Sequence, residues 1–163
     1  MLEWQCHNLD IVVSYGGDIA EVGAMSCRTG ARTGGLVAML RFAGGAVGTL
    51  GWGTYGGPGQ FAERIEILGD KGKGVIITNA REVTSYTEDT GQTWTSDWNP
   101  ISPNQSHVFN GYVGELRHFI DCIKKGKTPV PSIHDEAKTM ARLAEIATKA
   151  GIPIKWAPVS SML

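Results

Sequence analysis

Two apolar runs, residues 36–42 and 46–52, are separated only by the short link 43–45, which contains two glycines. Runs of this length joined by such a link are typical of a β-hairpin. Residues 61–78 continue the pattern, with a turn at 69–72. Hairpins in series form an antiparallel sheet. Helical patterns lie before and after this block, not between its strands. The sequence therefore predicts an α+β fold with an open, mainly antiparallel β-sheet and helices packed on one side, rather than alternating βαβ units.

Three helices are expected around the sheet. Residues 2–15 and 112–125 carry apolar side chains at helical spacing, and a third helix begins at Ser132, where Asp135 completes the pattern of a capping box. We expect the second and third helices to pack together on one side of a sheet of about six strands, and residues 28–35 to form a loop. The expected buried side of the second helix consists of Tyr112, Leu116, Phe119, Ile120 and Ile123.

Composition and charge restrict the class of protein. A chain of 163 residues with 42% hydrophobic and 19% charged residues suits one globular domain. Its net charge of −1 provides no attraction to nucleic acid or to an anionic membrane, and no apolar run reaches the ~20 residues that span a bilayer. Cys6, Cys27 and Cys122 are widely spaced and form no C-x-x-C pair, which favours reduced thiols in a cytoplasmic protein.

Residues 51–56 match the motif G-x-G-x-x-G by letter. A dinucleotide site needs a strand before this motif and a helix that opens at its end, so that helix amides meet the pyrophosphate. Here the residues Gly57, Pro58 and Gly59 follow the motif, and another strand comes next. The motif therefore indicates a strand that runs into a hairpin loop, and no cofactor-binding residues are expected on this chain.

The best candidate for chemistry is a polar stripe on the first helix. Glu3, His7 and Asp10 stand at i, i+4 and i+7, which a helix brings onto one face. A histidine titrates near neutral pH and can exchange a proton with a reacting hydroxyl or carbonyl, while an adjacent carboxylate orients its ring. From the spacing alone, a solvated helix face with an ordinary Glu–His pair is an alternative. A metal site is a third option, but no second histidine falls in register, and no metal ion is expected.

Two aromatic residues near the end of a central strand, Trp52 and Tyr55, could stack on a sugar ring. Packing in the core or at the sheet edge is the alternative for both. The remaining histidines are expected to be structural or solvated; they are His107, His118 and His134.

Five stretches, in this order along the chain, resemble motifs of the glucose–fructose oxidoreductase, inositol dehydrogenase and MocA-like (Gfo/Idh/MocA) family. Residues 3–10 resemble its D-x-G-x-H-x-x-D stretch. Residues 40–50 resemble its hairpin F-x-x-G-A-x-G-x-L, and residues 64–72 its strand and turn R-x-E-I-x-G-x-x-G. Residues 112–119 and 129–135 are similar to its two closing helices. The resemblance covers nearly the whole chain.

The resemblance implies a part of a larger enzyme. Proteins of this family have an N-terminal Rossmann domain that binds NAD or NADP, followed by a C-terminal α+β domain like that of dihydrodipicolinate reductase. The chain resembles the second domain alone, truncated at its N-terminus, without the Rossmann glycines or the lysine of the family's E-K-P motif. His7 takes the place of the histidine that assists proton transfer at the substrate hydroxyl. Glu3 takes the place of its acidic partner, which is usually aspartate. Asp10, Trp52 and Tyr55 are expected to contact the substrate.

We therefore expect residues 1–163 to form a single substrate-binding and oligomerisation domain of an NAD(P)-dependent oxidoreductase. Its substrate is a sugar, polyol or related hydroxy compound, and the chain is inactive without its missing Rossmann domain. A homo-oligomer is expected through the sheet face, because Leu36 and Leu40 point to one face while Val37 and Met39 point to the other. The alternative is a stand-alone binding or assembly module without catalysis. No nucleic acid and no membrane are expected as partners.

Overall fold

The computed structural model describes residues 2–30, 32–53, 62–95, 108 and 110–153. The chain divides into two compact units. Both units combine antiparallel strands with helix, so the predicted α+β class with open, antiparallel sheets is confirmed. Unit 1 consists of Met1–Tyr55 and Val130–Leu163, and unit 2 of Gly56–Pro129.

Unit 1 is built on a three-stranded antiparallel sheet in the order β1-β2-β3. The predicted hairpin is confirmed, and Leu40 pairs with Gly48 across it. The predicted loop at 28–35 is wrong, because the ladder between the first two strands continues to the pair Thr29 and Arg32. Ladder hydrogen bonds along this stretch outweigh the turn tendency of its individual residues. The strands are β1 (Ile19–Thr29), β2 (Arg32–Phe42) and β3 (Val47–Gly53).

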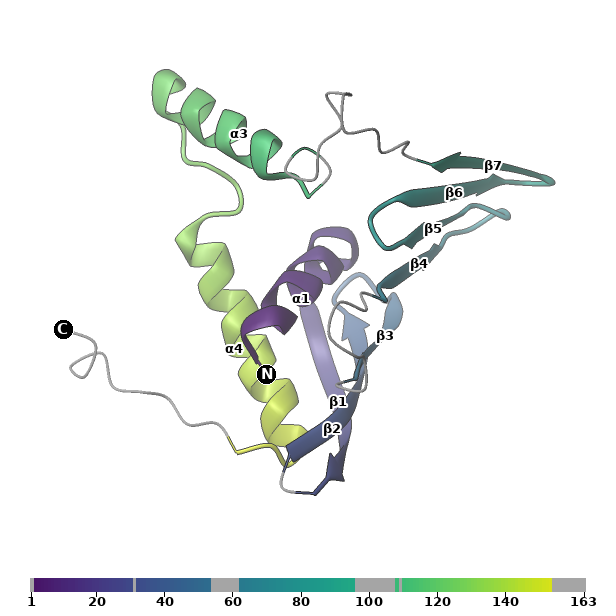
Figure 1. The fold of residues 1–163 in the computed structure, drawn as a ribbon, viewed down its shortest axis with the longest axis vertical. Coiled ribbons are helices and arrows are strands. Elements are labelled where there is room, and N and C mark those ends of the chain that lie inside the picture. The colour runs from purple at the N-terminus through teal and green to yellow at the C-terminus, as the bar shows by residue number, and fades with distance from the viewer. Residues whose placement is uncertain (1, 31, 54–61, 96–107, 109, 154–163) are drawn as a thin grey trace. The chain divides into compact units, whose positions relative to one another are not determined.

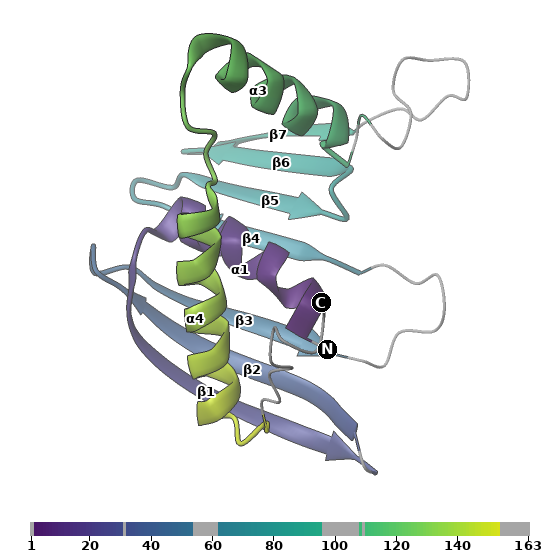
Figure 2. The same cartoon turned by 90° about the vertical axis from the view of Figure 1, so that its left-hand side faces the viewer.

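Two helices, α1 (Leu2–Gly16) and α4 (Ile133–Lys149), cover one face of this sheet (Figure 1, Figure 2). Helix α4 packs on α1 and on β1. The predicted capping box at its start is confirmed. The backbone N–H of Asp135 donates to the hydroxyl of Ser132, and the Ser132 N–H donates to the Asp135 carboxylate at 2.8 Å. The expected packing of α4 against the helix 112–125 stays a prediction, because that helix belongs to unit 2.

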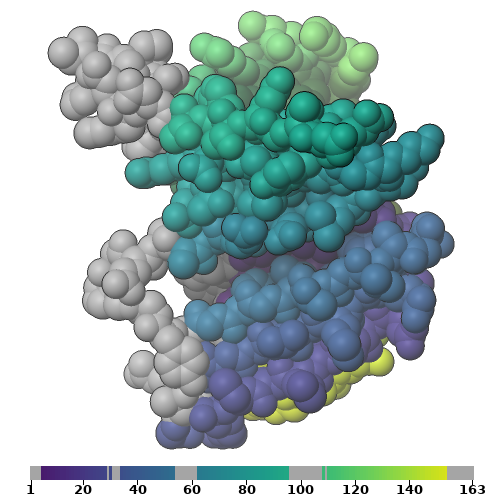
Figure 3. Space-filling view, turned by 90° about the vertical axis from the view of Figure 1, so that its right-hand side faces the viewer, coloured from purple at the N-terminus to yellow at the C-terminus, as the bar shows by residue number. Residues whose placement is uncertain are grey.

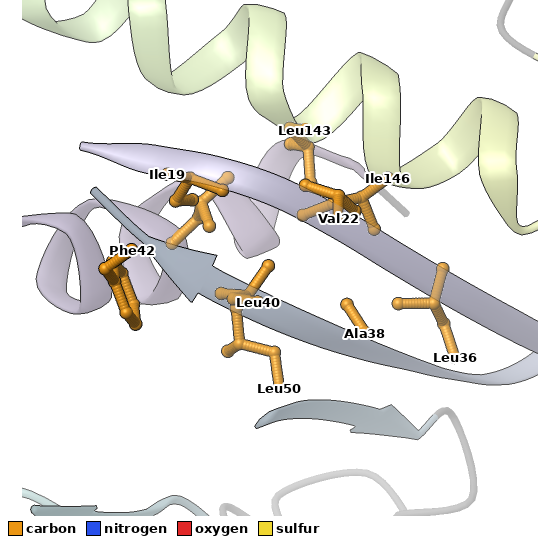
Figure 4. Close-up of a cluster of buried hydrophobic side chains, with 10 residues drawn as sticks. Ile19, Val22, Leu36, Ala38, Leu40, Phe42, Leu50, Leu143 and Ile146 are labelled. Carbon is orange, nitrogen blue, oxygen red and sulfur yellow. The ribbon is translucent and has the colours of Figure 1, made fainter. Parts of the chain in front are cut away.

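The core of unit 1 lies between the sheet and its two helices (Figure 4). Because side chains alternate along a strand, every second residue of β2 points to the helices. A glycine at the end of α1 allows the helix to approach the end of β2 closely. A Cβ at Gly16 would lie only 2.7 Å from Cδ1 of Phe42. The buried cluster consists of Leu9, Ile19, Val22, Leu36, Ala38, Leu40, Phe42, Leu50, Leu143 and Ile146.

Unit 2 contains a four-stranded antiparallel sheet in the order β4-β5-β6-β7. Ile77 pairs with Ile65 on one side and with Val83 on the other, so one face carries a row of apolar side chains. The described strands therefore form two sheets of three and four strands, not the expected sheet of about six. The elements are β4 (Arg64–Leu68), β5 (Gly74–Thr78), β6 (Glu82–Thr87), β7 (Thr90–Thr95) and α3 (Tyr112–Lys125).

Helix α3 has the bounds that the sequence predicts, but its apolar side is not buried. The five residues of that side are between 47% and 64% exposed, so the expectation of a buried face is wrong in this chain. Only Cys122 of α3 is buried. Periodicity specifies which residues share a face of a helix, whereas burial also requires an element that covers this face. The exposed side consists of Tyr112, Leu116, Phe119, Ile120 and Ile123.

Candidate functional site

Helix α1 carries the two candidate catalytic residues. Its apolar stripe fixes it to the core, because Leu9 is fully buried while Cys6 and Val13 pack against the same cluster. Helix α1 ends at Gly16, because the next residue, Gly17, allows the backbone to leave the helical conformation. Gly17 adopts a left-handed φ of 80°, and its N–H donates to the carbonyl of Val13 at 2.8 Å. The backbone of α1 is thus anchored on one side and open to solvent on the other.

His7 is exposed on α1. Residues two positions apart on a helix differ in direction by about 200°, so His7 points away from the side that buries Leu9. A side chain placed this way can reach a ligand without displacing any core residue. Glu3 lies in the first turn of the same helix, but its side chain is outside the described residues. The proton-transfer roles of His7 and Glu3 stay predictions.

Asp10 faces α4. Its Oδ1 accepts a hydrogen bond from the hydroxyl of Thr139 at 3.1 Å, and Thr139 is only 3% exposed. This bond joins the two helices and satisfies a buried hydroxyl group. The carboxylate has a second oxygen, so the predicted contact between Asp10 and a substrate stays a prediction beside this structural role.

Trp52 packs against the hydrophobic core, as the packing alternative expects. It lies on β3 opposite Leu36 of β2. Its role as a stacking platform for a sugar stays a prediction, and Tyr55 lies outside the described residues. The structure therefore brings His7 and Asp10 together on one helix, and places Trp52 on the sheet that this helix covers.

In the described part of the chain, the carboxylate of Asp135 belongs to a helix cap and not to a metal site. No group of three or more His, Cys, Asp or Glu side chains lies close enough together there to hold a metal ion. Hydrogen bonds from the backbone N–H and the hydroxyl of Ser132 hold the pKa of Asp135 below its usual value. In the same part of the chain, no helix is long and apolar enough to cross a membrane.

No sequence pattern predicts that two further residues, Thr139 and Gln5, lie beside the candidate site. Thr139 lies in an alanine-rich stretch of α4, and Gln5 is a single polar residue next to Cys6. Thr139 meets Asp10, and Gln5 lines a small cavity together with Trp52. A pattern within one segment cannot indicate which distant segment it meets, so only the fold identifies these residues.

Solved structures with a similar fold are dehydrogenases and other oxidoreductases. Levoglucosan dehydrogenase in complex with NADH gives a TM-score of 0.76 at 18% identity, over 91% of this chain and 47% of that chain. An oxidoreductase from Agrobacterium radiobacter in complex with NAD+, L-tartaric acid and magnesium gives 0.74 at 18% identity, over 99% and 49%. A UDP-N-acetylglucosamine 3-dehydrogenase from Acidithiobacillus ferrooxidans gives 0.72 at 12% identity, over 89% and 45%. The chain spans about half the length of these proteins, and identities this low show a shared fold alone.

A search of curated protein sequences found no match. A sequence model of a protein family, described as the oxidoreductase family C-terminal alpha/beta domain (GFO_IDH_MocA_C), matches residues 5–154. The match begins within α1 and runs beyond the end of α4, so it includes all the described strands. The resemblance based on five short motifs is thereby confirmed. The chain belongs to the Gfo/Idh/MocA oxidoreductases, in their C-terminal alpha/beta domain family.

Proposed function

We propose that this chain is the substrate-binding and oligomerisation domain of an NAD(P)-dependent oxidoreductase that acts on a sugar, polyol or related hydroxy compound. The family match over residues 5–154 is the observation that carries the proposal. Structures with the same fold include levoglucosan dehydrogenase with NADH and levoglucosan, and the same enzyme with NADH and L-sorbose. These complexes support a small substrate rich in hydroxyl groups.

Residues 1–163 act as one domain in this proposal, because a single family match runs through unit 1 and unit 2. NAD or NADP is held by a Rossmann domain that acts with this chain. The first two glycines of the motif at 51–56 do not fit a dinucleotide. Gly51 pairs with Val37 and Gly53 with Gly35 inside the sheet, so they do not form the turn that a pyrophosphate requires.

His7 is the proposed general base. Its imidazole would accept the proton of the substrate hydroxyl that is being oxidised, in concert with the lysine of the family's E-K-P motif on the Rossmann domain. A nicotinamide held by that domain would supply the hydride acceptor. Glu3, one helical turn earlier, orients the ring and stabilises its charged form. The exposure of His7 on a helix anchored by Leu9 supports this role, because the ring is accessible while its backbone is fixed. The further proposed substrate contacts are Asp10, Trp52 and Tyr55.

The test uses the chain joined to its nucleotide-binding domain, identified by an in-frame G-x-G-x-x-G and E-K-P segment in the coding sequence upstream of Met1. In that protein, His7→Ala should lower kcat by roughly 10²–10⁴-fold with a smaller change in KM, because the general base is lost. Glu3→Gln should give a smaller loss and shift the pH profile. His134→Ala is the matched control, since His134 is also exposed on a helix of unit 1, and it should keep wild-type kcat.

The outcomes separate the parts of the proposal. A His7→Ala enzyme with wild-type kcat would contradict the role of His7 and leave the family assignment intact. If no such segment lies upstream and the chain binds a sugar in calorimetry without oxidising it, the alternative of a stand-alone binding or assembly module is favoured. Hydride transfer by the 163-residue chain with added NAD would show that the proposed division between two domains is wrong.

The uncovered face of the three-stranded sheet is the proposed surface for self-association. Met25 is 74% exposed and lies opposite Val37, which is 50% exposed; Met39 is 61% exposed and lies opposite Gly23. Figure 3 shows the strands of unit 1 as open surface in purple and blue. Exposed apolar patches of this kind usually mark interfaces between proteins. We name Met25, Val37, Met39 and Val47 the open face.

Self-association is tested by sedimentation at tens of micromolar chain. The unaltered protein should sediment as a dimer or tetramer. Met39→Lys should weaken the oligomer by roughly tenfold or more, because an unpaired charge would be buried at the interface. Leu68→Lys is the matched control, since Leu68 is a 77% exposed apolar residue on β4, outside the open face. A purely monomeric unaltered chain would contradict the proposed surface.

We also place the protein in the cytoplasm. Cys6, Cys27 and Cys122 are thiols and form no disulfide. Three thiols in a chain of this size are typical of a reducing compartment. Cell fractionation of the host tests this placement. Detection of the protein in the periplasmic or secreted fraction would contradict it.

A further inference from the structure

Thr139 of α4 differs from the other polar residues of unit 1 in its burial. Among the residues that the structure describes, it is the single polar side chain that is buried, at 3% exposure. It lies in an alanine-rich stretch of the helix, where a small apolar residue would suit the packing equally well. A buried hydroxyl group lowers stability unless it is hydrogen-bonded, so the partner of this hydroxyl is the first evidence for its role.

The hydroxyl of Thr139 donates its hydrogen bond to the neighbouring helix α1. The acceptor is Oδ1 of Asp10, at 3.1 Å. A threonine inside a helix commonly donates to the carbonyl four residues earlier. Thr148 of the same helix does so, with its Oγ1 at 2.8 Å from the carbonyl oxygen of Ala144. A hydroxyl has one proton to donate, and Thr139 uses it to hold a carboxylate of another helix.

Asp10 lies between the buried and the exposed sides of α1. Successive residues of an α-helix are turned by about 100°, so Asp10 lies about 60° from His7 around the helix. Its exposure agrees with this position, because Asp10 is half-buried, His7 is exposed and Leu9 is fully buried. Thr139 holds one oxygen of the carboxylate. The other oxygen, Oδ2, accepts no hydrogen bond from the described part of the chain.

We propose that Thr139 is a positioning residue for the substrate. By holding Oδ1 of Asp10, it fixes the plane of the carboxylate, so that Oδ2 accepts a hydrogen bond from a substrate hydroxyl next to the one at His7. Side chains three residues apart on a helix have Cβ atoms about 5–6 Å apart. His7 and Asp10 therefore suit a substrate with two neighbouring hydroxyl groups. The inference rests on the proposed function, and it adds a residue of α4 to the proposed site.

The stability of unit 1 does not require this polar pair. Helices α1 and α4 already meet in the core, where Leu9 belongs to the same buried cluster as Leu143 and Ile146. Replacing both partners of a buried hydrogen bond with apolar groups of the same shape can be nearly neutral or stabilising. What Thr139 and Asp10 contribute, and two apolar residues could not, is a carboxylate of fixed direction beside His7.

The test measures KM and kcat in the chain joined to its nucleotide-binding domain, with the sugar or polyol that this protein oxidises. Thr139→Val keeps the shape of the side chain and removes the hydroxyl. KM should rise roughly tenfold with kcat little changed, because the hydrogen bond to the second hydroxyl is made equally before and during the reaction. Thr139→Ser should restore KM. Thr148→Val is the matched control and should keep wild-type KM, since the Thr148 hydroxyl bonds to its own helix.

A double-mutant cycle separates positioning from a structural role. In the Asp10→Ala background, Thr139→Val should change KM no further, because the carboxylate that Thr139 positions is already gone. A merely structural role would lower the folded fraction, and with it the apparent kcat, without changing the KM of the molecules that stay folded. Circular dichroism at the assay temperature gives the folded fraction of each variant. If Thr139→Val does not fold, Thr139→Ala takes its place, since alanine favours the helix.

The outcomes decide this inference separately from the role of His7. Wild-type KM in Thr139→Val overturns it, and if His7→Ala still loses kcat, the proposed function stands. A rise in KM that persists in the Asp10→Ala background also overturns it, because the effect then does not pass through the carboxylate. If His7→Ala keeps wild-type kcat, the role of His7 fails, while a rise in KM that Asp10→Ala abolishes still supports Thr139. If the chain binds a sugar in calorimetry without oxidising it, the same variants are compared by the Kd of that sugar.

Discussion

The two compact units of this chain differ in what their apolar residues contact. With the single exception of Cys122, the buried hydrophobic residues that the structure describes belong to unit 1. In unit 1, two helices cover a sheet and enclose a continuous cluster. In unit 2, the four strands are half-buried or exposed along their length, and the apolar side of α3 is open.

Helices α3 and α4 show this difference in burial between the two units. Both carry apolar residues at helical spacing, and both form as the sequence predicts. In α4, Leu143 and Ile146 are buried against the core, whereas in α3 Phe119 is 50% exposed and Ile123 64%. The pattern within a helix therefore determines its apolar face, while the rest of the fold determines whether that face contributes to stability.

The largest expected effect compares one residue type in the two helices. Ile146→Ala should lower the free energy of unfolding by about 2–5 kcal/mol, because it removes fully buried methyl groups and leaves a cavity. Ile123→Ala should change it by about 0.5 kcal/mol or less, because that side chain is mostly exposed. Urea titration followed by circular dichroism measures both values.

Equal losses of unfolding free energy for Ile146→Ala and Ile123→Ala would contradict this difference between α4 and α3. They would mean that the apolar side of α3 is covered in solution. If the cost of Ile123→Ala then grew with protein concentration, the cover would be another copy of the chain.

A second pair of variants tests the packing around glycine. Gly16→Ala should destabilise the chain by about 1–3 kcal/mol, because its Cβ would overlap the ring of Phe42 in the packed core. Gly114→Ala in α3 should instead stabilise by about 0.5–1 kcal/mol, because a Cβ there meets nothing within 4 Å and alanine favours the helix. Thermal unfolding of both variants gives the two signs directly. A destabilised Gly114→Ala would show that something contacts α3 at this point.

The smallest expected effect concerns the helix starts. Helix α4 begins with a capping box, whereas α3 begins at Gly111 with no side-chain cap. Ser132→Ala should therefore cost about 1 kcal/mol of unfolding free energy. Gly44→Ala is the control, since Gly44 lies in open space in a turn of unit 1 and its replacement should be close to neutral.

The same cap predicts a dependence on pH. The pKa of Asp135 is lowered in the folded chain by the Ser132 hydrogen bonds, so the folded state favours the carboxylate. Its contribution is present above the usual aspartate pKa and is lost as the pH falls through the lowered folded pKa. Asp135→Asn should thus be less stable than the unaltered chain at neutral pH, and the gap should close in acid. A gap that stays constant down to the acid limit would exclude this carboxylate as the cause.

The sequence predicts those parts of the fold that are encoded within one segment. The hairpin of β2 and β3, the bounds of α3 and the capping box at Ser132 depend on neighbouring residues and are confirmed. The loop expected at 28–35 and the single sheet were wrong, because strand length and strand grouping depend on ladder partners elsewhere in the chain. For the same reason, the sequence could not predict whether another element packs on the apolar side of α3.

The candidate site follows the same rule. The 3.6-residue period predicts that Glu3, His7 and Asp10 share one side of a helix, and the helix is confirmed. The bond between Asp10 and Thr139 joins residues 129 positions apart, and no local pattern indicates it. The cavity shared by Gln5 and Trp52 likewise arises only when α1 lies on the sheet.

The order of the two units along the chain has a consequence for synthesis. Unit 1 is discontinuous, since the whole of unit 2 separates its strands from α4. Its long-range bonds, between Asp10 and Thr139 and between Ser26 and the carbonyl of Ala150, span 129 and 124 residues. As the ribosome releases the chain, β1–β3 therefore wait with only α1 on their apolar face until α4 emerges, whereas the consecutive hairpins of unit 2 can pair at once. A nascent chain stalled before residue 133 would lack Leu143 and Ile146, and would present to chaperones the part of the core that these two residues cover.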